Sequence, residues 1–102
     1  MRGFLTSIVI LTGALTALSA EAADAAKGKT LFKSVGCYEC HGMMGQGAVP
    51  TGPRLAPNTP TLEIFLKELR TPRNVMPPYA ANLLPDESVA DIRAYLATIP
   101  AP

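Results

Sequence analysis

The sequence has few of the residues from which most catalytic and metal sites are built. Its 102 residues include one histidine and two cysteines. Two cysteines allow a single disulfide, which excludes the disulfide framework that many small exported domains use to compensate for a small core. A chain of this length is expected to form one domain, so its stabilisation has to come from something other than a set of cross-links.

Charge of either sign is not in excess, with nine basic and eight acidic side chains. Domains that bind nucleic acid present many Lys and Arg residues on one face, and nothing in this composition indicates such a face. We therefore expect no nucleic-acid partner.

Long apolar runs are absent except near the start of the chain. Arg2 precedes an apolar stretch of about 15 residues, and the small residues Ala20 and Ala22 follow it, which is the layout of a secretory signal peptide. An uncleaved membrane anchor is the alternative, but a membrane span needs roughly 20 apolar residues. The sequence therefore predicts a cleaved leader over residues 1–22 and one domain over residues 23–102, with no stable membrane insertion after cleavage.

Segments after the leader have the apolar spacing of amphipathic helices. The first is predicted over residues 25–35 and is expected to end at Gly36, with an apolar side made of Gly28, Leu31, Phe32 and Val35. The last is predicted to start near Pro85 and to stop before Pro100, and its expected buried residues are Val89, Ile92, Tyr95, Leu96 and Ile99.

A middle helix is predicted over residues 61–70, with Thr59 as N-cap and Pro60 at the first helical position. Its expected buried residues are Leu62, Phe65, Leu66 and Leu69. Residues 42–60 and 71–84 are rich in breakers and are expected to be loops, and nothing indicates a strand. The sequence therefore predicts an all-α fold of about three to four short helices. Long loops in so small a domain indicate a bound cofactor, because their ordering entropy has to be offset.

The most specific motif is Cys-Tyr-Glu-Cys-His at residues 37–41. Two thiols at this spacing reach the two vinyl groups on one edge of a haem, and the next imidazole then lies beneath the iron. A thioredoxin-like dithiol lacks its βαβ context, a zinc site lacks a fourth ligand, and a disulfide across two residues would be strained. The motif therefore predicts one haem c attached covalently through Cys37 and Cys40, with His41 as an iron ligand.

With this motif, the chain resembles small bacterial class I c-type cytochromes, monohaem proteins with His/Met ligation, over residues 25–99. The resemblance implies a haem wrapped by N-terminal, middle and C-terminal helices. It also implies that Gly28 and Phe32 in the first helix cross closely over Tyr95 in the last. A glycine inside a helix costs about 1 kcal/mol relative to alanine, and it is tolerated where a neighbouring helix packs against it.

A Gly-Pro-x-Leu segment after the haem histidine is a further feature of that family, and residues 52–55 match it. The resemblance implies that the Pro53 carbonyl accepts a hydrogen bond from the second ring nitrogen of His41, which orients the imidazole. Leu55 would then pack on the haem face. Arg54 is a candidate partner for a haem propionate, although an arginine in a loop is more often simply solvated.

The sixth iron ligand decides between an electron carrier and a catalyst. The chain has no second histidine, and Met43 and Met44 lie on the tether to the same haem face as His41. Met76 precedes Pro77 in a restricted loop, where the family places its distal methionine. A core-filling role for this methionine is the alternative. We predict that His41 and Met76 are the two iron ligands.

These features predict a periplasmic one-electron carrier that cycles between Fe(III) and Fe(II) and has no catalytic residues of its own. It would act free or as the electron-transfer subunit of a dehydrogenase. Its redox partner would be a periplasmic dehydrogenase, a cytochrome complex or a terminal oxidase. A subunit is expected to show an apolar patch, for which the candidates are Tyr79, Leu83 and Leu84. The alternative function is a catalytic or gas-sensing haem protein with a labile sixth ligand.

Overall fold

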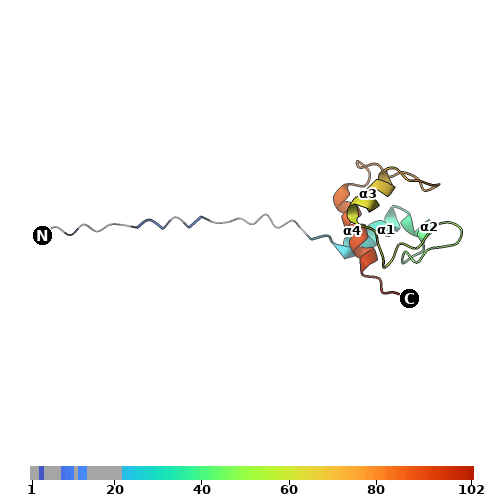
Figure 1. Ribbon diagram of the computed structural model, residues 1–102, viewed down its shortest axis with the longest axis horizontal. Helices are drawn as coiled ribbons and strands as arrows, with labels where there is room; N and C mark the ends of the chain where they lie inside the picture. Colours follow the sequence, from blue (N-terminus) through green and yellow to red (C-terminus); the bar gives the residue numbers. More distant parts are fainter. Residues whose placement is uncertain (1–2, 4–7, 11, 14–21) are drawn as a thin grey trace.

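The computed structural model describes residues 3, 8–10, 12–13 and 22–102. In this part of the chain the helices are, in order, α1 (Ala25–Ser34), α2 (Cys37–His41), α3 (Leu62–Arg70) and α4 (Asp86–Ala97) (Figure 1). The described residues form no strand, and the predicted all-α fold is confirmed. Most of the predicted leader lies outside these residues. Within the same part of the chain, no helix has the length and apolar character needed to cross a membrane.

Helix α1 begins and ends close to the predicted positions. Asp24 is its N-cap, and the Asp24 side chain accepts a hydrogen bond from the backbone N–H of Lys27 at 3.0 Å. The helix ends at Ser34, and Val35 is its C-cap. Gly36 then adopts a left-handed conformation, with φ of 87°, that glycine adopts at little cost. This glycine therefore ends α1, as predicted, and turns the chain directly into α2.

Helix α1 packs against α4 through a close approach of the two backbones (Figure 1). A Cβ atom on Gly28 would lie 1.8 Å from the carbonyl oxygen of Asp91, so a larger residue cannot fit unless a helix moves. The rings of Phe32 and Tyr95 pack beside this point, with 5.7 Å between centroids and an angle of 60° between planes. The predicted contact at the helix crossing is confirmed. The side chain of Asp91 also accepts a hydrogen bond from the N–H of Asp24 at 2.8 Å, which ties the start of α1 to α4.

Helix α3 starts later than predicted. Thr61 is its N-cap, and the Thr61 hydroxyl accepts a hydrogen bond from the N–H of Ile64 at 3.4 Å. The predicted N-cap at Thr59 and the predicted helical start at Pro60 are therefore wrong. Pro60 lies just outside the helix, and its carbonyl accepts a 2.7 Å hydrogen bond from the side chain of Arg93.

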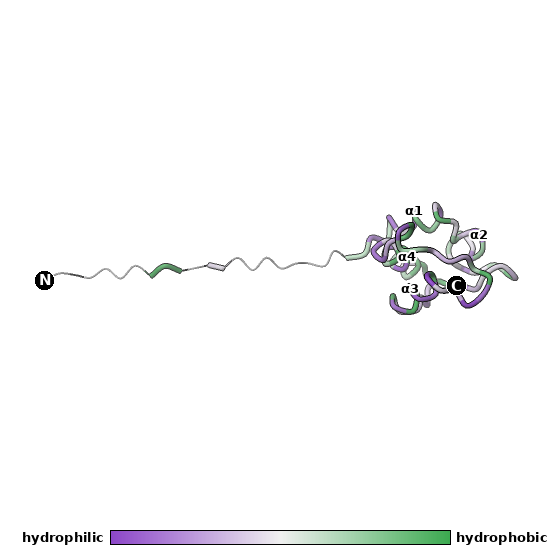
Figure 2. The backbone as a smooth tube through the Cα atoms, turned by 90° about the horizontal axis from the view of Figure 1, so that it is seen from above, coloured by the Kyte–Doolittle hydropathy of each residue, from purple (hydrophilic) through white to green (hydrophobic). Residues whose placement is uncertain are grey.

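The hydrophobic core of the described chain is formed mainly by α1, α3 and α4, and its buried residues are Phe32, Ala56, Phe65, Leu69, Leu84, Val89, Ile92, Tyr95 and Leu96. Figure 2 shows apolar and polar stretches alternating along the helical part, as amphipathic helices require. The prediction that Leu62 is buried is wrong, since it is 36% exposed. Ile99 lies beyond the end of α4 and is only half-buried. Leu84 is buried whereas Leu83 is 78% exposed, so these two leucines do not share a surface patch with Tyr79.

The glycine- and proline-rich segment between α2 and α3 is an ordered loop. The carbonyl oxygen of Gly45 accepts hydrogen bonds from the N–H groups of Leu55 and Ala56, at 2.7 and 3.1 Å. The N–H of Gly47 donates to the carbonyl of His41 at 2.7 Å. These bonds fold the loop back onto the end of α2, where the motif histidine lies.

Candidate haem-binding site

Helix α2 carries both cysteines of the motif. Cys37 is half-buried and packs against the core, whereas Cys40 is exposed. Both are free thiols. Burial raises the pKa of the Cys37 thiol to about 11, and a hydrogen bond to the backbone of Cys37 acts in the opposite direction. Two free thiols at this spacing on one short helix are available for thioether bonds to a haem.

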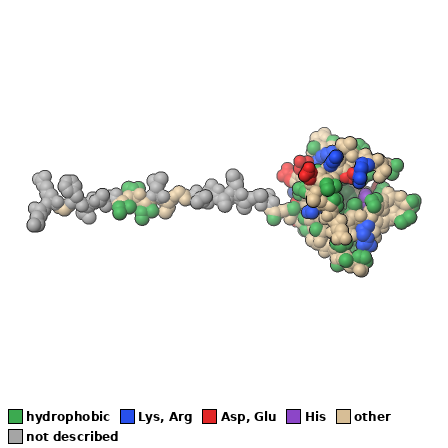
Figure 3. All heavy atoms as spheres, in the orientation of Figure 1, with side chains coloured by type: hydrophobic (Ala, Val, Ile, Leu, Met, Phe, Trp, Pro, Cys, Tyr) green, Lys and Arg blue, Asp and Glu red, His purple; other side chains and the backbone are tan. Residues whose placement is uncertain are grey.

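His41 is the last residue of α2 and is buried. Its Nδ1 atom lies 2.8 Å from the carbonyl oxygen of Pro53. Because a carbonyl oxygen can only accept, Nδ1 is the donor in this contact, and Nε2 is the ring nitrogen that could ligate a metal. Metal-ligating histidines have this arrangement, since the bond at the second nitrogen fixes the orientation and tautomer of the ring. In Figure 3 the histidine colour shows only as a small area that hydrophobic side chains border.

Tight packing of the loop against α2 holds Pro53 next to His41. A Cβ atom on Gly52 would lie 2.5 Å from the carbonyl oxygen of Cys40 and 3.0 Å from Nδ1 of His41. The hydroxyl of Thr51 donates to the same Cys40 carbonyl at 3.0 Å. Gly52 belongs to the predicted Gly-Pro-x-Leu segment, whereas no sequence signal indicates the contact made by Thr51.

The last residues of that segment differ in burial. Leu55 is half-buried and packs against the core. Arg54 is exposed, and its Nη1 atom donates to the carbonyl of Ala56 at 3.4 Å. The two ion pairs found among the described residues involve other side chains. The positive charge of Arg54 is thus available to an anionic group from outside the chain.

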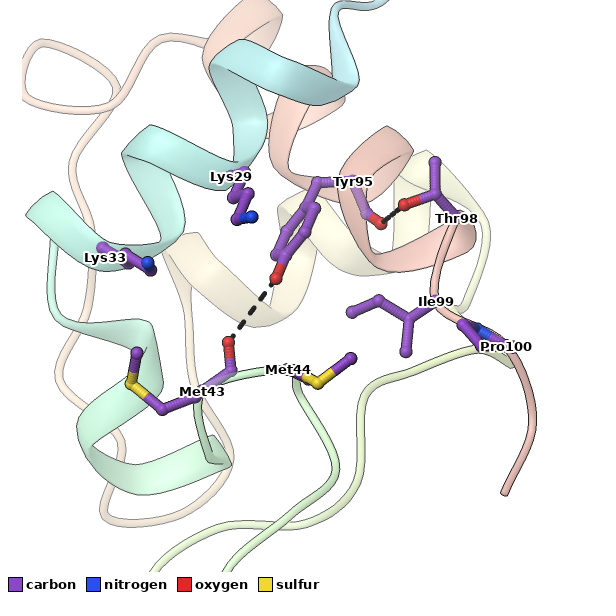
Figure 4. A pocket seen from close by; sticks show the side chains of 8 residues that line it. All are labelled: Lys29, Lys33, Met43, Met44, Tyr95, Thr98, Ile99 and Pro100. Carbon is purple, nitrogen blue, oxygen red and sulfur yellow. Dashed lines mark hydrogen bonds between the residues drawn. The ribbon is translucent and has the colours of Figure 1, made fainter.

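Met76 lies in the loop between α3 and α4, and its half-buried side chain packs against the core. The methionines next to the motif, Met43 and Met44, are 48% and 50% exposed. They line a pocket of about 360 Å³ together with Lys29 and Lys33 of α1 (Figure 4). None of the predicted haem ligands lines that pocket. Among residues 22–102, Met76 is the methionine that is not in the exposed class.

Tyr79 connects the loop of Met76 to the end of α1. Its hydroxyl donates a hydrogen bond to the carbonyl oxygen of Val35 at 2.8 Å. Burial is the largest cause that raises the pKa of Tyr79, and the charges of Cys37, Cys40 and Glu39 raise it further. The hydroxyl therefore stays protonated at neutral pH and able to donate.

These side chains fit the binding of a haem c. They supply two free thiols on one short helix, an imidazole that is held at Nδ1 by a backbone carbonyl, and a thioether sulfur from a separate loop. Ligation by one imidazole and one thioether is a combination found in c-type cytochromes. In the described part of the chain, no group of three or more His, Cys, Asp or Glu residues is placed to hold a metal ion by itself.

Comparison with known proteins identifies the family. A family model described as cytochrome c oxidase, cbb3-type, subunit III matches residues 23–96. The cytochrome c subunit of 4-cresol dehydrogenase (hydroxylating) from Pseudomonas putida is 32% identical over 105 residues, which cover 99% of this chain and 87% of that subunit.

A solved structure is also similar, that of cytochrome cL from the marine methylotroph Methylophaga aminisulfidivorans, with a TM-score of 0.54 and 22% identity. The match covers 78% of this chain and 53% of that one, so this chain spans about half the length of that cytochrome. At this identity the likeness supports the fold alone. The family model and the Pseudomonas subunit go further, and they show that this chain belongs to the cytochrome c family, whose members carry covalently attached haem c.

Proposed function

We propose that this chain is an exported monohaem cytochrome that carries one electron at a time and is not itself catalytic. The observation that carries the proposal is the 2.8 Å contact between His41 Nδ1 and the Pro53 carbonyl, beside two free thiols. When bound, haem c supplies a reversible Fe(III)/Fe(II) couple. In this proposal Cys37 and Cys40 hold the haem through thioether bonds, and His41 ligates the iron through Nε2.

Pro53 and Arg54 would support the haem from the loop. The Pro53 carbonyl keeps the proton of the imidazole on Nδ1 and raises the basicity of Nε2, which strengthens ligation. Leu55 would lie against the haem face, where it excludes water. Arg54 would pair with a propionate, since its guanidinium is exposed and neither ion pair of the described chain involves it.

Met76 is the proposed sixth ligand. Its side chain is half-buried and packs against the core, whereas Met43 and Met44 are about half exposed. A thioether favours ferrous iron and therefore raises the reduction potential relative to harder ligands. An iron with two protein ligands offers no open position for a substrate, which supports a carrier and not a catalyst.

The proposed partner is a redox protein, with a dehydrogenase first among the candidates, because a curated relative is the cytochrome subunit of one. A cytochrome complex or a terminal oxidase is the alternative partner. Electron-transfer encounters use small and weak interfaces, so both a free carrier and a bound subunit agree with a chain of this size. Cleavage of residues 1–22 and a periplasmic location complete the proposal, and they rest on the leader pattern.

The test uses holoprotein produced in a host that attaches haem to exported chains. We expect an intact mass equal to residues 23–102 plus one haem, and a weak far-red absorption band in the ferric form that reports the iron–thioether bond. Met76→Ala should abolish that band, whereas the matched truncation Met44→Ala should leave it unchanged. A protein without covalent haem, or a far-red band that survives Met76→Ala, would overturn the proposal.

A further inference from the structure

Tyr79 stands at the junction of the loop that carries Met76 and the helices around it. Only Pro77 and Pro78 lie between Met76 and Tyr79. Neither proline has a backbone N–H, and both have a fixed φ, so this short arm is stiff. The first backbone donor after Met76 is therefore the N–H of Tyr79, which donates to the carbonyl of Leu69 at 2.8 Å.

The hydroxyl of Tyr79 makes a second contact, with a different part of the chain. It donates to the carbonyl of Val35 at 2.8 Å. Val35 is the C-cap of α1, where carbonyl groups have no partner within the helix, and it lies two positions before Cys37. This bond therefore joins the loop of Met76 to the segment that leads directly into the haem motif.

Arg70 makes the third contact. Its Nη1 atom donates to the carbonyl of Tyr79 at 2.9 Å, and its Nη2 atom pairs with Asp86 at 2.7 Å. The Arg70 side chain is only 22% exposed, and its planar guanidinium holds both acceptors in a fixed geometry. Tyr79 thus contacts the C-terminal ends of α1 and α3, and Arg70 links it to the N-terminal end of α4.

We propose that Tyr79 and Arg70 are positioning residues that hold Met76 at the iron and so set how often this ligand dissociates. The inference rests on the proposed role of Met76 as sixth ligand. Tyr79 does not touch the iron in this proposal. It acts through the stiff Pro77-Pro78 arm, because displacing Tyr79 moves the whole arm.

The experiment compares holoprotein variants by the rate at which the reduced form binds CO, which requires dissociation of Met76. Tyr79→Phe removes only the hydroxyl and keeps the ring and both backbone contacts. Loss of one hydrogen bond of ordinary strength should raise the fraction without the methionine ligand, and hence the CO-binding rate, about fivefold. Arg70→Gln removes two contacts and should raise the rate at least as much.

The matched control is Tyr95→Phe, which also removes one hydroxyl. The Tyr95 hydroxyl donates to the carbonyl of Met43 at 3.5 Å, beside the haem motif and not in the loop of Met76. We expect its CO-binding rate to equal that of the unmodified protein. A positioning role also predicts that, on heating the ferric protein, Tyr79→Phe lowers the temperature at which the far-red band is lost and leaves the melting of the helical circular dichroism nearly unchanged, whereas a purely structural role predicts that both temperatures fall together.

The outcomes separate the two proposals. If Met76→Ala retains the far-red band, the ligand assignment fails and this inference fails with it. If Met76→Ala abolishes the band but Tyr79→Phe and Arg70→Gln bind CO at the unmodified rate, the carrier proposal stands and the positioning role is overturned. Equal acceleration by Tyr79→Phe and Tyr95→Phe would also overturn it, because the effect would then not depend on the loop of Met76.

Discussion

Replacing Gly28 by alanine tests the helix crossing on which the fold depends. The added Cβ atom would lie 1.8 Å from the carbonyl oxygen and 2.3 Å from the carbonyl carbon of Asp91, whereas ordinary contacts begin at 3.4 Å. Both atoms belong to the backbone of α4, so no side chain can rotate away to make room. The two helices have to separate by more than about 1 Å at this point, which loosens the packing of Phe32 against Tyr95.

The expected change in the free energy of unfolding is the difference between a gain in helix propensity and a loss from overpacking. Alanine is better than glycine inside a helix by about 1 kcal/mol. Overpacking typically costs 1–3 kcal/mol and occasionally more, and a rigid backbone contact belongs at the upper end of that scale, about 3–4 kcal/mol. We therefore expect Gly28→Ala to lose about 2–3 kcal/mol of the free energy of unfolding. For a domain of this size that loss lowers the melting temperature by roughly 10–20 °C.

The assay is thermal unfolding of the holoprotein, followed by helical circular dichroism. Ala26→Gly is the control, because Ala26 is exposed on the same helix. It should lose only the propensity difference of about 1 kcal/mol, so it should melt above Gly28→Ala. A Gly28→Ala protein that melts at or above the unmodified temperature would refute the reasoning, since alanine would then have been accommodated without separating the helices.

Three further substitutions test individual contacts by denaturant unfolding of the holoprotein. Asp24→Ala removes the side-chain cap on the N–H of Lys27 and should lose about 1 kcal/mol, and an unchanged unfolding midpoint would contradict the cap. Asp91→Ala leaves the N–H of Asp24 without its 2.8 Å partner and should lose about 1–3 kcal/mol. Asp86→Asn breaks the ion pair with Arg70. Because the Asp86 side chain is 71% exposed, the loss in the free energy of unfolding should stay below about 1 kcal/mol and should be smaller still in high salt.

The helices themselves were largely predictable, because their apolar spacing and their stop signals are local. Gly36 lies two residues beyond the end of α1, and Pro72 lies two residues beyond the end of α3. The start of α3 was not predictable with the same certainty, because Thr59 and Thr61 both offer a capping hydroxyl. The structure also places the side chain of Arg93, which is far away in the sequence, on the carbonyl of Pro60 between these two threonines, and no local pattern indicates that contact.

Helix α2 was not predicted as a separate element. Five residues are too few to show a helical period, and those of α2 are the residues of the haem motif, which show no apolar spacing. The exposure of Leu62 has a related cause. Leu62 has the spacing expected of the apolar face, but it is the first residue of α3. The first residue of this helix that is buried in the core is Phe65, one turn later.

The contacts around the loop of Met76 could not be predicted from the sequence. The haem motif and the Gly-Pro-x-Leu segment are patterns of adjacent residues, so they can be found without a structure. The hydrogen bond from Tyr79 to Val35 joins residues 44 positions apart and uses a backbone carbonyl, which every residue possesses. Such a contact leaves no pattern in the sequence, because only one of its partners is specified by a side chain.

The fold and the site are held by different interactions, and this separation has a measurable consequence. The core is apolar packing between α1, α3 and α4, whereas the loop beside His41 is held by the contact of the Pro53 carbonyl with His41, and the loop of Met76 is held by the bond from the N–H of Tyr79 to Leu69. Hydrogen bonds contribute about 1 kcal/mol each, and a fully buried aromatic or aliphatic side chain contributes roughly two to three times as much. The loops should therefore open locally at a lower free energy than the core. The far-red band of the unmodified protein should accordingly vanish before the helices melt, and Gly28→Ala should narrow that interval by lowering the melting temperature of the core.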